Sequence, residues 1–198
     1  MLELLKHAYE KGVDYITVYA LSTENLNRPK AELDGLYELV RTRFNSLVEE
    51  NLKKGVRLKI LGDTSLLPQD IREILADAEK KSAHFEGKGF NIALAYGARA
   101  EIVRAVNLAI EKGEKVTEAT FADLLYTASQ PEVDLIIRTG KEKRLSNFLL
   151  YQAAYSEFYF SDKMFPDFSN DDLDEAFAEY AKRTRRFGKT DEQKTEEK

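Results

Sequence analysis

The stretch Tyr15-Ile-Thr-Val-Tyr-Ala-Leu21 decides the fold of this chain, because it is rich in β-branched and aromatic residues and carries no charge. Such a run predicts a strand that is buried on both faces, as strands of a parallel sheet are. Apolar residues at helical spacing precede it over Leu2–Lys11, with Gly12 as the stop, and a long amphipathic helix follows Pro29. The strand therefore belongs to a chain in which helices and strands alternate.

Four further strands are predicted downstream, over Arg57–Leu61, Phe90–Ala95, Asp134–Ile137 and Glu157–Phe160. Helices are predicted between these strands, and a final amphipathic helix follows the last one. This order predicts an α/β domain with a mostly parallel central sheet flanked by helices. We expect the domain to span residues 1–188 and the wholly polar residues 189–198 to form a disordered tail.

The composition is that of a soluble globular protein, with 43% hydrophobic and 33% charged residues among 198. A net charge of −5 argues against bulk attraction to nucleic acid, so we expect no such partner. The absence of cysteine excludes disulfides, thiol nucleophiles and thiolate zinc sites. No run approaches the roughly 18 apolar residues of a membrane span, and charges interrupt the first helix as they do not in a signal peptide. We therefore expect a cytoplasmic protein.

Polar clusters follow four of the five predicted strands. They are Ser22–Pro29, Gly62-Asp63, Tyr96–Arg99 and Arg138–Asn147. Because the carboxyl ends of parallel strands meet at one edge, where α/β proteins bind ligands, these clusters predict a binding site. The cations that would gather there are Arg28, Arg99, Arg138, Lys141, Lys143 and Arg144. Several guanidinium groups on one rim suit a diphosphate, and a helix beginning at Ser146 or Asn147 would add free N–H groups.

Each of these residues also has a purely structural interpretation. Ser146 or Asn147 can cap a helix, Arg99 can be a solvated charge at a helix start, and Arg28 can belong to a turn. Arg138 is harder to explain in this way, because an arginine directly after a buried strand must pair or reach a ligand. The gathering of these residues at strand ends favours the functional interpretation.

Three long segments resemble motifs of the cis-prenyltransferase family, the undecaprenyl-diphosphate-synthase type of enzyme. Tyr19-Ala-Leu-Ser-Thr-Glu-Asn-Leu-Asn-Arg-Pro29 resembles Y-A-F-S-x-E-N-W-x-R-P, and Asn91-Ile-Ala-Leu-Ala-Tyr-Gly-Ala-Arg99 resembles N-x-A-x-N-Y-G-G-R. Asp134-Leu-Ile-Ile-Arg-Thr-Gly-Lys-Glu-Lys-Arg-Leu-Ser-Asn-Phe148 resembles D-L-x-I-R-T-G-G-E-x-R-x-S-N-F. Shorter matches follow in family order at Gln152–Phe160, Phe165–Phe168 and Arg185–Gly188.

The resemblance implies an enzyme that condenses isopentenyl diphosphate with an allylic diphosphate to give a cis-polyprenyl diphosphate, using Mg²⁺. By position in the motifs, Arg138, Arg144 and Ser146 would hold the diphosphate of isopentenyl diphosphate, with Arg99 as a further substrate-binding residue. Glu157 matches the carboxylate that contributes to the metal site.

The resemblance also implies catalytic roles for Asn25 and Arg28, on a mobile loop near the substrates. It implies a homodimer that acts at the membrane surface, peripheral to the membrane. The growing chain would occupy an apolar tunnel between the sheet and the first long helices, lined by the stripe from Leu33 to Phe44. An ordinary helix–sheet core explains that stripe equally well.

The chain departs from the family at its beginning. The family opens with a strand and the motif H-x-A-x-I-M-D-G-N-G-R-W-A, whose aspartate binds magnesium, and no segment here resembles it. We therefore expect a sheet without its first strand, and little or no turnover by this chain alone. Three explanations stand: a misplaced start codon or truncated chain, a degenerate relative, or a partner that supplies the missing parts. The first is favoured, because a sheet with an empty inner position leaves backbone groups unpaired. Under the second and third explanations, the protein is a non-catalytic, diphosphate-binding subunit or relative that stabilises a partner.

Smaller departures lie within the matched motifs. They are Leu26 for Trp, Ala95 for Asn, Ala98 for Gly, Lys141 for Gly and Lys143 for His. Ala98 and Lys141 matter most if the backbone there needs a positive φ or a close approach to phosphate.

Overall fold

The computed structural model of the chain describes residues 1–183, which form five strands and six α-helices. The strands are β1 (Tyr15–Ser22), β2 (Arg57–Leu61), β3 (Gly89–Tyr96), β4 (Leu135–Arg138) and β5 (Glu157–Phe160). The helices are α1 (Leu2–Glu10), α2 (Lys30–Lys53), α3 (Gln69–Ser82), α4 (Ala98–Lys112), α5 (Glu118–Ala122) and α6 (Asn170–Ala181). The expected tail at 189–198 and the motif Arg185–Gly188 lie outside the described residues.

The expected α/β architecture with parallel strands flanked by helices is confirmed, and the ends of the five strands differ from those predicted by one residue at most. The strands form two parallel sheets rather than a single one. One has the order β1-β3-β2, and the other pairs β4 with β5. Side chains join the two sheets, because Ile16 of β1 and Ile137 of β4 pack in the same apolar cluster with Phe168 and Leu173.

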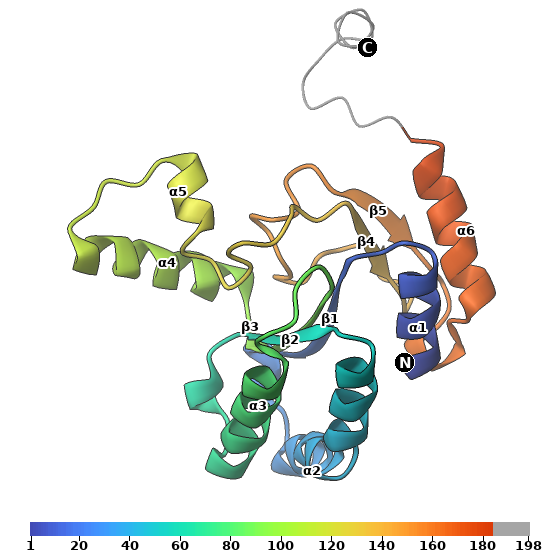
Figure 1. The fold of residues 1–198 in the computed structure, drawn as a ribbon, viewed down its shortest axis with the longest axis horizontal. Coiled ribbons are helices and arrows are strands. Elements are labelled where there is room, and N and C mark those ends of the chain that lie inside the picture. The colour runs from blue at the N-terminus through green and yellow to red at the C-terminus, as the bar shows by residue number, and fades with distance from the viewer. Residues whose placement is uncertain (184–198) are drawn as a thin grey trace, which may run out of the picture.

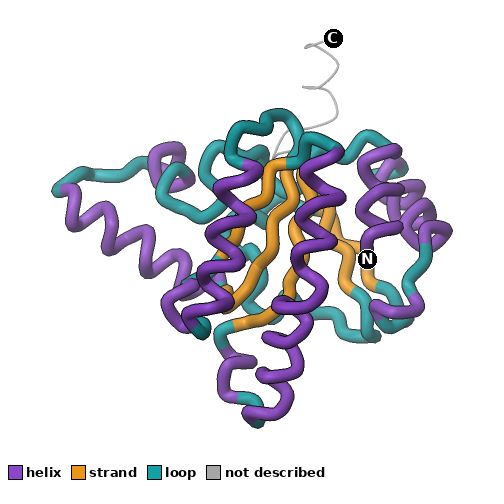
Figure 2. Tube along the Cα trace, turned by 60° about the horizontal axis from the view of Figure 1, so that its bottom comes forward, coloured by secondary structure: helices purple, strands orange, loops and turns teal. Residues whose placement is uncertain are grey.

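Helices α2 and α3 cover one face of the three-stranded sheet, and α1 packs beside α6 (Figure 1). Figure 2 shows two helices crossing in front of the strands. The core between these helices and the three-stranded sheet contains Phe90, Ile71 and Val56, whose exposed fraction is zero. Helices α4 and α5 extend away from this body (Figure 1). Within residues 1–183, no helix has both the length and the apolar character needed to cross a bilayer.

The stripe on α2 that was expected to line a tunnel packs into this core. Tyr37 and Phe44 are buried, and Leu33, Leu36 and Val40 are partly buried against the same cluster. The packed-core interpretation therefore accounts for the stripe in this structure, and the tunnel stays a prediction.

The expectation that a helix begins at Ser146 or Asn147 is wrong. Residues 146–155 form turns and bends. Ser146 and Asn147 have φ values of 49° and 62°, in the left-handed region, from which a right-handed helix cannot start.

Candidate diphosphate-binding site

Arg138 at the end of β4 holds together the loop that follows it, residues 139–147. Its Nη1 donates to Ser146 Oγ at 2.9 Å and to the backbone carbonyl of Arg144. The far side of the loop is tied to the chain after β5, because Gly140 N donates to Lys163 O at 2.8 Å and Lys141 N to Ser161 O at 3.2 Å. The structure therefore brings the predicted residues Arg138, Arg144 and Ser146 into one small loop.

The charge of this loop is predominantly positive. It and the strand end carry Arg138, Lys141, Lys143 and Arg144 against one carboxylate, Glu142, which pairs with Arg144. The Arg144 side chain is 62% exposed, so little desolvation opposes its release from Glu142 toward an anion. Lys141 has a φ of 66°, so the position where the family motif has glycine does adopt a left-handed backbone.

Asn147 joins this loop to the start of α4. Its Oδ1 accepts the backbone N–H of Arg99 at 2.9 Å, and its carbonyl accepts that of Ala98 at 2.9 Å. Its Nδ2 donates to Glu24 Oε1 at 2.7 Å. Gly97 is required beside it, because an added Cβ would lie 2.7 Å from Asn147 Nδ2. One side chain thus links the loops after β1, β3 and β4.

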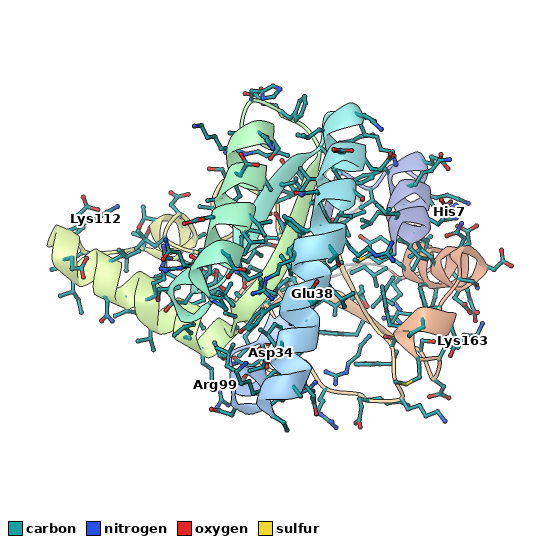
Figure 3. The ribbon with its side chains drawn as sticks, turned by 90° about the horizontal axis from the view of Figure 1, so that it is seen from below. His7, Asp34, Glu38, Arg99, Lys112 and Lys163 are labelled. Atoms are coloured by element: carbon teal, nitrogen blue, oxygen red, sulfur yellow. The ribbon has the colours of Figure 1, made fainter. Side chains whose placement is uncertain are left out.

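Arg99 is exposed in the first turn of α4, at the same end of the molecule as Asp34 of α2 (Figure 3). Its backbone is fixed by Asn147, and Arg138 is fixed by the neighbouring Ser146. Arg99 and Arg138 are therefore held by two neighbouring residues of one loop, Asn147 and Ser146. This agrees with the expectation that residues after the carboxyl ends of parallel strands gather at one edge.

Tyr19 of β1 packs against the end of the loop 139–147. Its ring stacks on Phe148 with centroids 4.7 Å apart and meets Tyr96 edge-on at 6.0 Å. Its hydroxyl donates to the carbonyls of Tyr96 at 3.1 Å and Ser146 at 3.4 Å. Burial, and secondarily the charge of Glu24, raises the pKa of Tyr19 to about 12, so it remains a neutral donor at physiological pH.

Asn25 and Arg28 lie on the 3-10 turn after β1, Glu24–Asn27 and its cap. In the favoured orientation of the Asn25 amide, its oxygen accepts from Arg28 Nε at 3.1 Å and Nη2 at 3.2 Å. Arg28 also pairs with Glu32 at 3.6 Å, and both of these side chains are more than half exposed. The structure thus places these two predicted catalytic residues in mutual contact, on the loop that Glu24 connects to Asn147.

Glu157, the predicted metal ligand, is not brought to this cluster. Strand register pairs Glu157 with Leu135 and Arg138 with Phe160, so Glu157 lies at the opposite end of the two-stranded sheet from Arg138. Its Oε2 accepts from Arg183 Nη1 at 2.8 Å.

The residues of the described chain do not by themselves fit a magnesium ion. Across residues 1–183, no three His, Asp or Glu side chains gather in an arrangement that could hold a metal. Mg²⁺ requires an octahedral shell of oxygen ligands, and one carboxylate already paired with a guanidinium does not provide it.

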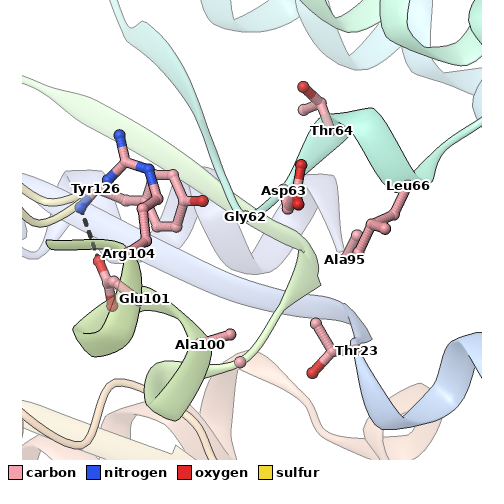
Figure 4. A pocket seen from close by; sticks show the side chains of 11 residues that line it. Thr23, Gly62, Asp63, Thr64, Leu66, Ala95, Ala100, Glu101, Arg104 and Tyr126 are labelled. Atoms are coloured by element: carbon pink, nitrogen blue, oxygen red, sulfur yellow. Dashed lines mark hydrogen bonds between the residues drawn. The ribbon is translucent and has the colours of Figure 1, made fainter. Parts of the chain in front are cut away.

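A cavity of about 490 Å³ opens at the carboxyl ends of β2 and β3, next to Thr23 and Gly97 (Figure 4). Arg104 lies over the Tyr126 ring, 4.3 Å from its centroid, on one side of the cavity, and Asp63 lies on the other. Asp63 caps the turn Thr64–Leu66 by accepting from Ser65 N at 3.0 Å, which gives it a structural role.

Glu101 lines this cavity with only 1% exposure, and both of its carboxylate oxygens accept hydrogen bonds. It accepts from the Tyr96 hydroxyl at 2.5 Å, from Tyr126 N at 2.7 Å and from Gln152 Nε2 at 3.1 Å. Burial, together with the charge of Glu101, raises the pKa of Tyr96 far above its ordinary value. Glu101 thus joins α4 to the end of β3 through Tyr96 and to two later segments of the chain through Tyr126 and Gln152.

Three functional positions were not found from the sequence: Asn147 as a link between loops, Glu24 as its partner and Tyr19 as the support of the loop. Glu24 and Tyr19 both stand in the segment Tyr19–Pro29, which was the available signal. The role of Asn147 depends on contacts with residues 48 and 123 positions away, which local pattern cannot reveal.

The fold defines a class: an α/β protein whose parallel strands are flanked by helices, with polar loops at the carboxyl ends of the strands. Within that class, this chain belongs to the family described as "Putative undecaprenyl diphosphate synthase", whose model matches residues 1–188. By family it is therefore an isoprenyl (cis-prenyl) transferase.

Individual relatives agree. The isoprenyl transferase of Aquifex pyrophilus is 37% identical over 188 residues, covering 94% of this chain and 81% of that protein. A "probable undecaprenyl diphosphate synthase" from Campylobacter jejuni superposes with a TM-score of 0.87 at 37% identity, covering 96% of this chain and 90% of that one. Lavandulyl diphosphate synthase from Lavandula x intermedia, solved with dimethylallyl diphosphate, gives 0.88 at 37% identity, with 94% and 84% covered.

Proposed function

We propose that this chain binds isopentenyl diphosphate through Arg138, Arg144 and Ser146, for condensation with an allylic diphosphate to a cis-polyprenyl diphosphate. The observation that carries the proposal is the contact of Arg138 with Ser146 at the carboxyl end of β4, where the strand end and the loop together carry four cations and one carboxylate. A diphosphate entering this loop would replace the backbone carbonyl of Arg144 as the partner of Arg138, and charge-assisted hydrogen bonds to it are stronger than neutral ones.

The roles of the neighbouring loops follow from their contacts. Arg99 supplies a further guanidinium beside Asn147. Arg28, held by Asn25, can turn from Glu32 toward the allylic diphosphate, whose departure requires stabilisation of negative charge on the leaving group. Mg²⁺ stays the proposed cofactor of the reaction, and Glu157 would bind it only with further ligands that residues 1–183 do not provide, after giving up its pairing with Arg183.

We further propose that residues 1–198 alone turn over slowly or not at all. The matched motifs supply the side of the site that binds isopentenyl diphosphate, and no segment resembles the motif that the family uses for magnesium and the allylic diphosphate. The two sheets leave β1 and β4 without a shared hydrogen bond, which supports an additional strand between them in the active enzyme. The alternative is a non-catalytic, diphosphate-binding subunit that stabilises a partner.

A homodimer, peripheral to the membrane and in the cytoplasm, completes the proposal. Val103, Val106 and Ile110 form one apolar face on α4 and are 60%, 43% and 70% exposed. Analytical ultracentrifugation of the Ile110→Glu variant tests the dimer. The control is Leu39→Glu, which replaces an apolar side chain that is 58% exposed on α2. We expect Ile110→Glu to be a monomer and Leu39→Glu to remain a dimer. A wild-type protein that sediments as a monomer would contradict the proposed dimer.

Calorimetric titration with isopentenyl diphosphate tests the binding assignment. We expect Arg138→Gln to weaken binding by tenfold or more, because a charged hydrogen bond contributes about 1.5–3 kcal/mol and 1.4 kcal/mol is tenfold. Arg72→Gln, an exposed arginine on α3, is the matched control. Equal affinities would overturn the assignment.

Radiolabelled condensation assays on the same samples test turnover separately. Fast turnover by the chain alone would remove the proposal of weak activity and leave the binding assignment standing. Activity that rises when the chain is mixed with a full-length isoprenyl transferase would support the subunit alternative.

A further inference from the structure

A second pocket lies at the other edge of the three-stranded sheet. Its volume is about 190 Å³, and its walls include Tyr15, Arg57 and Gly89, which strand register places side by side at the amino ends of β1, β2 and β3. The diphosphate loop lies at the carboxyl ends, and β3 alone extends about 23 Å between the two edges. We call this hollow the amino-edge pocket, and nothing in the proposed prenyl transfer uses it.

Three cations line the amino-edge pocket: Arg57, Lys59 and Lys88. Arg57 and Lys59 alternate with the buried Leu58 and Ile60, so both point to the same face of β2. Lys88 is joined to this strand through the bond from Arg57 N to its carbonyl at 2.9 Å.

Within the described residues none of these cations forms an ion pair, although the charges of Glu79 and Glu101 act on Lys59 from farther away. Among residues 1–183, no carboxylate lies within 4.0 Å of any of the three to form an ion pair, and the one acidic residue of the wall, Glu86, is exposed. The pKa of Lys59 is lowered, first by partial burial and second by the nearby charge of Arg57. Lys59 is half-buried without an ion pair, and the exposed Arg57 and Lys88 stand beside it, so this group of three positive charges favours an anion.

The walls of the pocket are rigid. Lys59 Nζ donates to Ala128 O at 3.3 Å, and the Lys88 ammonium lies 5.6 Å from the centroid of the Tyr9 ring. The Gln130 side chain is locked to Asn91 of β3 by hydrogen bonds of 2.6 and 3.0 Å. Since Lys59 and Lys88 have these contacts before any ligand arrives, less ordering entropy opposes binding than for free surface lysines.

The size of the pocket limits the ligand. Its 190 Å³ is below the roughly 300–1,000 Å³ of pockets for organic ligands and several times the roughly 30 Å³ of a water molecule. A phosphate or diphosphate group fits, and an isoprenoid chain does not.

We propose that the amino-edge pocket is a second anion site, in which Arg57, Lys59 and Lys88 bind a phosphate group independently of the diphosphate loop. The phosphate can come from a free ion or from the headgroup of an anionic lipid, and both present the same oxygens to the guanidinium and ammonium groups.

The test is an amide NMR titration of the full chain with inorganic phosphate at constant ionic strength. Saturating shifts are expected at Gly87, Gly89 and Ser129, resolved from the separate response of Gly140 in the diphosphate loop. The double variant Arg57→Gln, Lys59→Met should weaken the amino-edge response at least tenfold and leave that of Gly140 unchanged. Lys53→Met, an exposed lysine at the end of α2, is the control.

A second arm identifies the source of the phosphate. Co-sedimentation compares vesicles of phosphatidylcholine alone with vesicles that also contain phosphatidic acid. If the wild type binds the acidic vesicles and the double variant does not, the site takes a lipid headgroup. If inorganic phosphate gives saturating shifts and the acidic vesicles are not bound, the site takes a free ion. The proposal is overturned if neither response depends on Arg57 and Lys59, or if chloride produces the same shifts. The double variant removes the repulsion between Arg57 and Lys59 but also the hydrogen bond from Lys59 to Ala128 O, so its melting temperature is measured to show that it remains folded.

Discussion

Asn147 Oδ1 accepts the backbone N–H of Arg99 at 2.9 Å, so a residue of the loop after β4 satisfies an N–H in the first turn of α4, whose N-cap is Gly97. The same side chain donates to Glu24 in the loop after β1. The pKa of Glu24 is lowered, chiefly by its own backbone N–H and in part by this amide, which keeps the acceptor ionised. Three loops that are separate in sequence are thereby held in one arrangement around Arg138.

Replacing Asn147 with alanine should destabilise the protein by about 1–2 kcal/mol, because the Arg99 N–H loses its acceptor and alanine adopts a φ of 62° less readily than asparagine. Chemical denaturation measures this, and titration with isopentenyl diphosphate should show weaker binding as the loops separate. Asn107→Ala, on the exposed side of the same helix, is the control and should stay within about 0.5 kcal/mol of wild type. Unchanged stability and affinity in Asn147→Ala would contradict the linking role.

Removing the Glu101 carboxylate should be more damaging. Glu101→Ala leaves the Tyr96 hydroxyl, the Tyr126 N–H and one Gln152 N–H without their partner, and each buried unsatisfied group costs about 1–3 kcal/mol. We expect a loss of at least 3 kcal/mol in the free energy of unfolding, measured in urea. Glu111→Ala, exposed near the end of α4, should change it little. A small effect at Glu101 would mean that water replaces the carboxylate.

Lys141→Gly should stabilise the protein. A non-glycine residue at a φ of 66° carries a strain of roughly 1–2 kcal/mol, and the added freedom of glycine in the unfolded chain offsets about 0.4–1 kcal/mol of the relief. The expected gain is about 0.5–1 kcal/mol in thermal or chemical denaturation. Lys143→Gly removes the same charge from the same loop without a positive φ, so it should be neutral or destabilising. A loss at both positions would show that strain at Lys141 is absent.

Acid stability should depend on Asp172. Lys163 is the main cause, with Ser169, of a fall in the pKa of Asp172 from 3.8 to about 2. A lowered pKa in the folded state contributes stability that is fully present above about pH 4 and lost as the pH falls through about 2.

Lys163→Met should therefore raise the pKa of Asp172 toward 3.8 and move acid unfolding to higher pH. Carboxyl-carbon NMR and circular dichroism measure the two effects. Lys112→Met, at the far end of α4 (Figure 3), should leave both unchanged. Coincident acid transitions in all three proteins would exclude the proposed contribution.

The sequence by itself determined the order and type of the main elements and the edge at which the polar residues gather. The run Tyr15–Leu21 did form a strand of a parallel sheet, and parallel strands place their carboxyl ends together. That logic was enough to bring Arg138, Arg144 and Ser146 to one loop. The expectation that this strand is buried on both faces was wrong, because β1 lies at the edge of the three-stranded sheet and most of its residues are only partly buried.

Only the tertiary structure decided how those groups are held. The two-sheet arrangement, the hydrogen bond of Asn147 to the first turn of α4, and the placement of Glu157 at the opposite strand end from Arg138 depend on contacts between distant segments. The amino-edge pocket is a further case, because Arg57 and Lys59 on β2 meet Lys88 only when β2 pairs with β3. Local pattern fixes which face a residue presents, but register and loop geometry, which depend on the whole fold, decide which side chain it meets.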